Sequence, residues 1–138
     1  MIQTLGVPDG CIYKIKRPKQ GGLPGFHFGL VLGDGSVVDF GYETHIRICD
    51  AYTFAAGLDV TVISRIPESE QLNVHRRLQL AFANPAAYDF WKWNCENFVN
   101  FLVGEEARSD QVRWLELAAV VSAVAALAKF AKVAKFAA

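Results

Sequence analysis

The stretch FHFGLVLGDGSVVDFG, residues 26–41, decides how this chain folds. Two runs rich in aromatic and β-branched residues flank the glycine-containing segment 33–35, and this pattern predicts a β-hairpin with a short loop. In the register that this loop favours, Asp39 lies opposite Gly29. His27 then shares a face with Asp39 as its diagonal neighbour, about 7–8 Å away at the backbone.

An imidazole and a carboxylate can meet across this gap, because the glycine opposite Asp39 leaves room on that face. A slip of one residue would move one of the two side chains to the other face, so the pair depends on the register. Taken alone, a histidine inside a strand is more often structural than catalytic. The pair becomes a candidate site only together with a reactive group nearby.

The remaining sequence predicts more strands and then helices, which together indicate an α+β domain. The first of these strands mixes β-formers with basic residues, as is typical of an exposed strand. Its basic cluster (Lys14, Lys16, Arg17 and Lys19) could contact anionic lipid headgroups or protect an exposed sheet edge. The predicted strands besides the hairpin cover 11–17, 44–48 and 59–64, and the predicted helices cover 68–83, 95–104 and 111–138.

Cys95 stands at the predicted start of a helix, directly after Asn94, which is a good N-cap residue. A helix N-terminus stabilises an anion by about 0.3–1 kcal/mol, which is too little to make a thiolate predominant. A nearby imidazolium would be needed. We therefore predict that Cys95 is a nucleophile, that His27 is its general base and acid, and that Asp39 orients His27. The alternative is that Cys95 is a buried small residue.

Composition limits the classes of function. The chain has 138 residues with 14 Lys and Arg against 14 Asp and Glu, so the formal net charge is zero and a dedicated nucleic-acid binder is not expected. The cysteines Cys11, Cys49 and Cys95 form no CxxC pair, which argues against a disulfide scaffold or a structural zinc site. The first residues do not resemble a signal peptide, and we expect a cytoplasmic protein.

Two separated motifs resemble the H-box/NC family of lecithin:retinol acyltransferase-like (LRAT-like) proteins, which includes the H-Ras-like suppressor phospholipase/acyltransferases. The segment YDFWKWNCENF (88–98) resembles the NC motif, with Tyr88 placed seven residues before Cys95. The segments PDGCIYKIKRP (8–18) and FHFGLVLGDGSVVDF (26–40) resemble the opening strand and the H-box. The likeness covers roughly residues 8–113.

The resemblance implies a permuted papain-like fold of the NlpC-type superfamily, an antiparallel sheet packed on helices. It also implies a phospholipase/acyltransferase that forms a thioester on Cys95 from a lipid ester and passes the acyl group to water or an amine. His27 carries over as the base, Asp39 stands where the family commonly has a second histidine, and Tyr88 and Trp93 are candidates for substrate contact. No metal or organic cofactor is expected.

Two other functions are also compatible with these residues. One is a cysteine amidase or peptidase on a papain-like fold. The other is a non-catalytic H-box/NC interaction protein, because the motif alone does not establish catalysis.

The chain is predicted to divide into a domain at 1–113 and an Ala-rich, basic-tipped hydrophobic helix at 114–138. Residues 117–128 are uncharged and span about 18 Å, whereas a hydrocarbon core is about 30 Å thick. Extending the span takes in three lysines, so full insertion is marginal. We expect a peripheral or C-terminally anchored protein at a membrane surface. The alternative is a helix docked on its own domain or on a second copy, and the oligomeric state is left open.

Overall fold

The computed structural model describes residues 8–87, 89, 93–105 and 110–137, with side chains in the last helix only as far as Phe130. The chain forms two compact units, residues 1–108 and residues 109–138, and each is described by itself.

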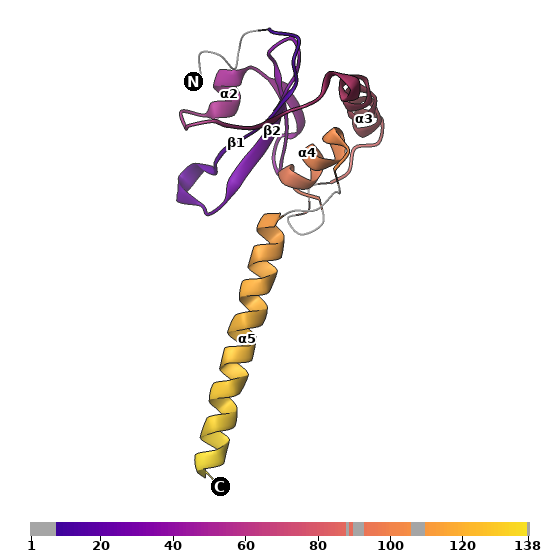
Figure 1. Ribbon diagram of the computed structural model, residues 1–138. Helices are drawn as coiled ribbons and strands as arrows, with labels where there is room; N and C mark the ends of the chain where they lie inside the picture. The colour runs from indigo at the N-terminus through magenta and orange to yellow at the C-terminus, as the bar shows by residue number, and fades with distance from the viewer. Residues whose placement is uncertain (1–7, 88, 90–92, 106–109, 138) are drawn as a thin grey trace. The chain divides into compact units, whose positions relative to one another are not determined.

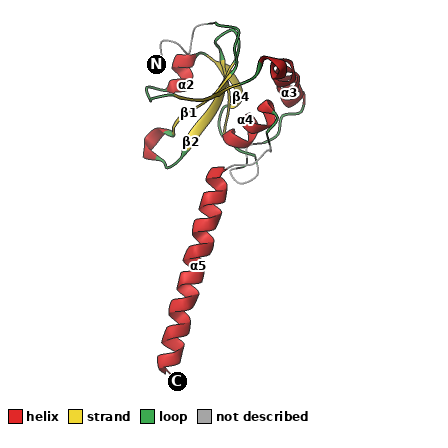
Figure 2. Cartoon of the chain, viewed as in Figure 1, coloured by secondary structure: helices red, strands yellow, loops and turns green. Residues whose placement is uncertain are grey.

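The first unit contains a five-stranded sheet in the order β4-β3-β2-β1-β5, in which all neighbouring strands are antiparallel. Figure 1 and Figure 2 show the chain with its helices and strands. Helices pack on this sheet, so the predicted α+β class is confirmed. The strands are β1 (Tyr13–Pro18), β2 (Phe26–Val31), β3 (Val37–Gly41), β4 (His45–Cys49) and β5 (Thr61–Arg65).

The hairpin between β2 and β3 has the predicted register, with Gly29 opposite Asp39. Its loop is closed by two backbone hydrogen bonds, from Leu32 N to Ser36 O at 2.8 Å and from Gly35 N to Leu32 O at 2.9 Å. Gly35 has a φ of 85°, a conformation that glycine adopts without steric cost. The loop therefore fixes which side chains share each face of the sheet.

Strand β1 differs from the prediction of an exposed edge strand, because it pairs with both β2 and β5. Two of its basic side chains are buried. Lys14 Nζ donates to Asn100 Oδ1 at 2.7 Å and to Glu105 Oε2 at 2.8 Å, while Arg17 donates to backbone carbonyls. The edge interpretation was wrong because local sequence does not show that β5 returns to cover β1.

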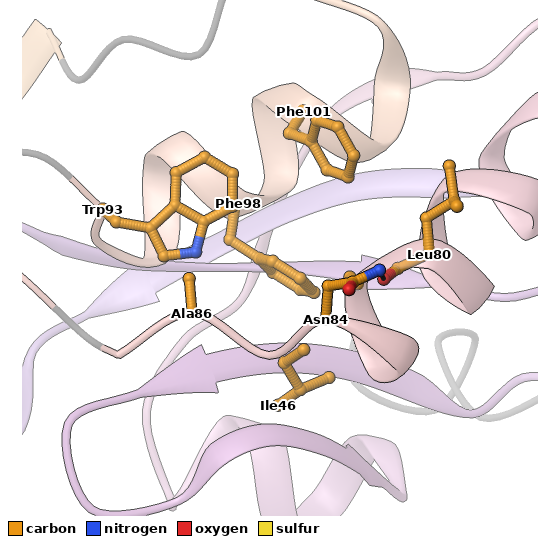
Figure 3. A pocket seen from close by; sticks show the side chains of 8 residues that line it. Ile46, Leu80, Asn84, Ala86, Trp93, Phe98 and Phe101 are labelled. Carbon is orange, nitrogen blue, oxygen red and sulfur yellow. Dashed lines mark hydrogen bonds between the residues drawn. The ribbon is translucent and has the colours of Figure 1, made fainter.

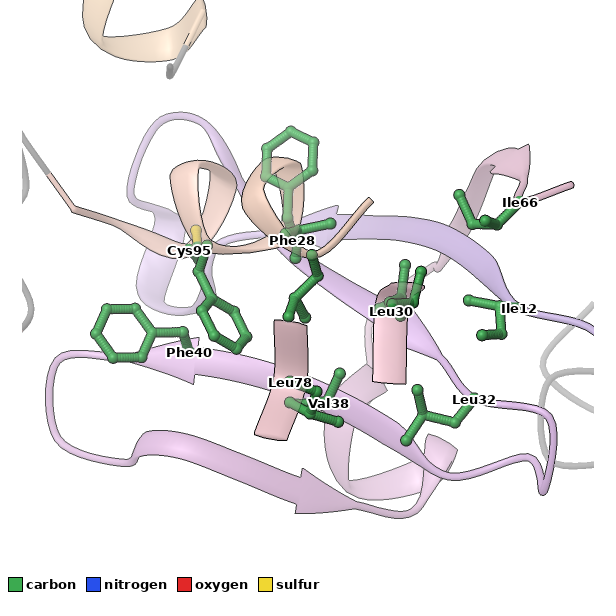
Figure 4. Close-up of a cluster of buried hydrophobic side chains, with 13 residues drawn as sticks. Ile12, Phe28, Leu30, Leu32, Val38, Phe40, Ile66, Leu78 and Cys95 are labelled. Carbon is green, nitrogen blue, oxygen red and sulfur yellow. The ribbon is translucent and has the colours of Figure 1, made fainter. Parts of the chain in front are cut away.

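Helices cover both faces of the sheet. On one face α3 (Gln71–Ala83) and α4 (Cys95–Val103) enclose the larger core (Figure 4). On the other face lies α2 (Ala51–Ala55), a short helix that the sequence analysis did not anticipate. It is capped by Asp50, whose side chain accepts from Thr53 N at 2.6 Å. The described part of this unit also contains two short 3-10 helices, η1 (Gln20–Gly22) and η2 (Glu68–Glu70).

Helix α4 begins and ends where the sequence predicts. The Asn94 side chain accepts from the amides of Glu96 and Asn97, and the Asn97 side chain accepts from the Asn94 amide at 3.1 Å, which makes a reciprocal cap. Gly104 ends the helix with a φ of 78°. This cap fixes Cys95 as the first residue of the helix.

The second unit is helix α5 (Asp110–Ala137), which matches the predicted third helix. The 21 residues Asp110–Phe130 are long and apolar enough to cross a membrane. At a rise of about 1.5 Å per residue they reach roughly the thickness of a hydrocarbon core. Large apolar side chains on this helix are exposed, including Trp114, Leu117, Val121, Val124, Leu127 and Phe130.

Candidate active site

Asp39 lies at the centre of a buried polar cluster. Its side chain is fully buried, and its Oδ2 atom lies 2.8 Å from His27 Nε2. Arg47 lies opposite Asp39 on β4 and donates from Nε to Oδ1 at 3.0 Å and from Nη2 to Oδ2 at 2.6 Å. Both carboxylate oxygens are thus paired, as a buried charge requires.

The electrostatics of the cluster favour charged groups. Burial alone would raise the pKa of Asp39, but hydrogen bonds from His27 and Arg47 outweigh it and hold the pKa below its usual value. Burial alone would likewise lower the pKa of His27. Hydrogen bonds to Asp39 and to Cys95 outweigh that effect and raise the pKa above its usual value. The imidazolium form of His27 is therefore stabilised.

Cys95 meets this cluster from helix α4. Its side chain lines the same cavity as His27 and contributes to the raised pKa of that imidazole, and its Sγ lies 3.9 Å from the carbonyl oxygen of Phe26 at the start of β2. Because Asp39 occupies His27 Nε2, Nδ1 is the ring nitrogen left to exchange a proton with the thiol. The three side chains therefore have the order of a nucleophile, a base and an orienting carboxylate.

The thiol borders an open cavity of about 420 Å³. Although Cys95 is only 3% exposed, it lines this cavity together with His27. Three basic residues, Arg17, Lys19 and Arg47, also line it, against one acidic residue, Glu43. The cavity beside Cys95 is therefore large enough for a small substrate, and its lining has an excess of positive charge.

Three of the first four amides of helix α4 donate to the cap residue Asn94. Those of Glu96 and Asn97 donate to the Asn94 side chain, and that of Phe98 donates to the Asn94 carbonyl. Within the described part of the chain, the Cys95 amide has no acceptor. An N–H at a helix N-terminus can stabilise a negative oxygen beside the attacking sulfur.

Phe54 of helix α2 packs against the face of the His27 ring. The two rings stack with their centroids 5.6 Å apart and an interplanar angle of 29°. Phe54 reaches this position because its neighbour in the sheet is Gly29, at which an added Cβ would lie 2.6 Å from the phenyl ring. Arg17 Nε donates to the Phe54 carbonyl at 2.5 Å and ties α2 to β1.

The structure brings together Cys95, His27 and Asp39 among the residues proposed from sequence. Trp93 does not join them. It packs edge-on against Phe101, with ring centroids 5.8 Å apart, and lines a separate apolar pocket of about 210 Å³ (Figure 3). Tyr88 lies outside the described residues.

Sequence analysis missed Arg47 and Phe54. A signal for Arg47 was present, because the turn that joins β3 to β4 sets Gly41 opposite His45 and hence Asp39 opposite Arg47. No comparable signal existed for Phe54, because its contact with His27 depends on how α2 packs across the sheet. Each of these two residues holds a neighbouring site residue in place, Arg47 through Asp39 and Phe54 through the His27 ring.

Comparison with known proteins gives no match to a family model, to a curated protein or to a solved structure. Among the described residues, no group of three or more His, Cys, Asp and Glu side chains could hold a metal ion.

Proposed function

We propose that this protein is a cysteine-dependent phospholipase/acyltransferase that forms a thioester on Cys95 from a lipid ester. The observation that carries the proposal is that one imidazole, His27, pairs with a buried carboxylate and lines the same open cavity as the Cys95 thiol. The resemblance of the two motifs to LRAT-like proteins supports a permuted papain-like arrangement of this sheet and helix α4. It also supports lipid esters over other acyl donors.

The first half-reaction transfers the acyl group to the enzyme. His27 takes the thiol proton, and the Cys95 sulfur attacks the ester carbonyl carbon to give a tetrahedral oxyanion. The Cys95 amide donates to that oxyanion. The carbon–oxygen bond of the leaving alcohol then breaks, and imidazolium His27 protonates the alcohol. The products are a thioester on Cys95 and neutral His27.

The second half-reaction releases the acyl group. Water or an amine loses a proton to His27 and attacks the thioester carbonyl, after which the carbon–sulfur bond breaks and the proton returns to the thiolate. The product is a free acid or an amide. Asp39 stays ionised throughout, because it serves to orient and stabilise the imidazolium.

Mass spectrometry of the intact chain after incubation with mixed phospholipid vesicles tests the proposal. We expect an increase in mass equal to one acyl chain, which Cys95→Ser abolishes. His27→Ala should slow its formation by about 10²–10⁴-fold. Cys49→Ser is the matched control and should leave the adduct unchanged, because Cys49 does not line the cavity.

Three outcomes would change the assignment. An adduct from a peptide ester but not from a phospholipid would point to an amidase or peptidase. No adduct from either donor would leave a non-catalytic interaction protein. Equal adducts in the wild type and Cys95→Ser would mean that another residue is acylated and would remove Cys95 as the nucleophile.

We also propose that helix α5 associates with the membrane that holds the substrate. Its exposed apolar side chains and its length support this role. Deleting residues 114–138 should reduce sedimentation with phospholipid vesicles at least tenfold, while hydrolysis of a soluble ester persists. Unchanged sedimentation would contradict a membrane role. A change from dimer to monomer in analytical ultracentrifugation would instead assign the helix to contact between copies.

A further inference from the structure

An apolar groove lies beside the cavity that contains Cys95. Its outer part has a volume of about 520 Å³ and is lined by Phe40, Ile46, Phe82, Pro85 and Ala86, among others. Its inner part is the pocket of about 210 Å³ that Trp93, Phe98 and Phe101 line (Figure 3). Ile46 and Ala86 border both parts. We call the two parts together the Ile46 groove.

The Ile46 groove neighbours the candidate active site, and one side chain is common to the two linings. Phe40 lines both the cavity of Cys95 and the outer part of the groove. Helix α4 borders both spaces, because Cys95 at its start lines the cavity, and Phe98 and Phe101 on its following turns line the inner part of the groove. Phe101 lies about 9 Å further along the helix axis than Cys95.

The chemistry of the lining selects the occupant. Hydrocarbon side chains dominate both parts, and His45 and Asn84 contribute the polar side chains. The basic side chains instead line the neighbouring cavity, where Arg17 is 7% exposed and donates to the carbonyls of Phe54 and Pro18. A polar group therefore fits the cavity of Cys95, and an alkyl chain fits the groove.

We propose that the Ile46 groove binds the acyl chain of the ester whose carbonyl carbon is attacked by Cys95. This inference rests on the proposed function and adds to it the site that selects acyl chains by length. A peptide in the same place would leave its backbone N–H and C=O groups opposite hydrocarbon, which is unfavourable. Ala86 is the residue at which the groove can be narrowed, because it borders both parts and is exposed.

Chain-length selectivity of the full-length protein tests the groove. The probes are p-nitrophenyl butyrate and p-nitrophenyl laurate, and the variant is Ala86→Phe. We expect the ratio of kcat/KM for laurate to that for butyrate to fall about tenfold. The new phenyl ring takes the space of the distal methylene groups of laurate, whereas the position of the ester carbonyl is unchanged. Ala83→Phe is the matched control, since Ala83 is exposed, is the last residue of α3 and does not line the groove.

A binding measurement separates failure of the groove from failure of the enzyme proposal. Dodecanoate, below the concentration at which it forms micelles, should bind Cys95→Ala, and adding Ala86→Phe should weaken that binding about tenfold. If both esters are hydrolysed and Ala86→Phe leaves their ratio and dodecanoate binding unchanged, the groove is not the acyl site. If neither ester is hydrolysed but dodecanoate binding responds to Ala86→Phe, the groove stands and the catalytic proposal falls.

Discussion

The two faces of the β2–β3 hairpin are both buried, but one buries apolar side chains and the other buries a charged one. Leu30 and Val38 point into the core under α3 and α4, where hydrocarbon packs on hydrocarbon. Asp39, one residue further along, points to the other face and is equally buried, yet it carries a charge shared between His27 and Arg47. The first face tolerates change in proportion to lost volume, whereas the second depends on every member keeping its partner.

Among the substitutions on the two faces, replacing Asp39 should have the largest effect on the free energy of unfolding. Asp39→Asn leaves two cationic partners without their carboxylate and should lower the free energy of unfolding by about 3–5 kcal/mol at pH 7. Leu30→Ala should lower it by about 2–5 kcal/mol through a cavity. Urea titration at several pH values distinguishes the two losses.

The pH dependence follows from the lowered pKa of Asp39. A group with a lowered pKa in the folded state contributes stability above its unfolded pKa, near 3.9, and this contribution is lost as the pH falls through the folded value. The deficit of Asp39→Asn should therefore shrink below about pH 4, while that of Leu30→Ala persists. Equal shrinkage for both variants would contradict an ionised Asp39.

Gly29→Ala should have the next largest effect, because it adds one methyl group to the polar face. The new Cβ would lie 2.6 Å from the Phe54 ring, so Phe54 must move away from His27. We expect a loss of about 1–3 kcal/mol and slower acylation of Cys95. Phe54→Leu combined with Gly29→Ala should recover part of the stability. No recovery would mean that the strain lies elsewhere.

The pKa of His27 tests directly whether Asp39 stabilises the imidazolium form. NMR should give His27 a pKa above the ordinary value near 6.5, and Asp39→Asn should lower it, since burial then acts with an unpaired Arg47 nearby. A raised pKa contributes stability below the unfolded value that is lost as the pH rises through the folded one. An unchanged pKa in Asp39→Asn would exclude Asp39 as the partner that charges His27.

Lys14 should show the smallest effect. It is a buried charge on the core side of β1, but its carboxylate partner Glu105 is 55% exposed and can be solvated when unpaired. Lys14→Met should change the free energy of unfolding by less than about 1 kcal/mol, because packing replaces the ion pair. A loss of several kcal/mol would place Lys14 with Asp39 among the indispensable charges.

Local patterns carried much of the fold and the centre of the site. The loop at 33–35 set the register that joins His27 to Asp39, and Asn94 marked the start of α4 and so the position of Cys95. Both signals act within a few residues along the chain. The structure confirms these elements, while the catalytic roles of the three residues stay predictions.

Contacts between distant segments escaped the sequence analysis. Strand β1 is an inner strand because β5 pairs with it, and the sequence around β1 contains no signal for this pairing. Phe54 lies on a five-residue helix whose place depends on the gap at Gly29. The apolar groove likewise combines β4, the end of α3 and α4, so none of these segments predicts it alone.

The second cation beside Asp39 has a consequence for turnover. If His27 were the only partner of this carboxylate, each loss of the imidazole proton would leave the buried negative charge of Asp39 without a counterion. With Arg47 holding both oxygens, at 3.0 and 2.6 Å, the carboxylate keeps a counterion whether the ring is protonated or neutral. A proton can therefore move between the sulfur, the ring and the leaving group while the Asp39–Arg47 ion pair stays in place.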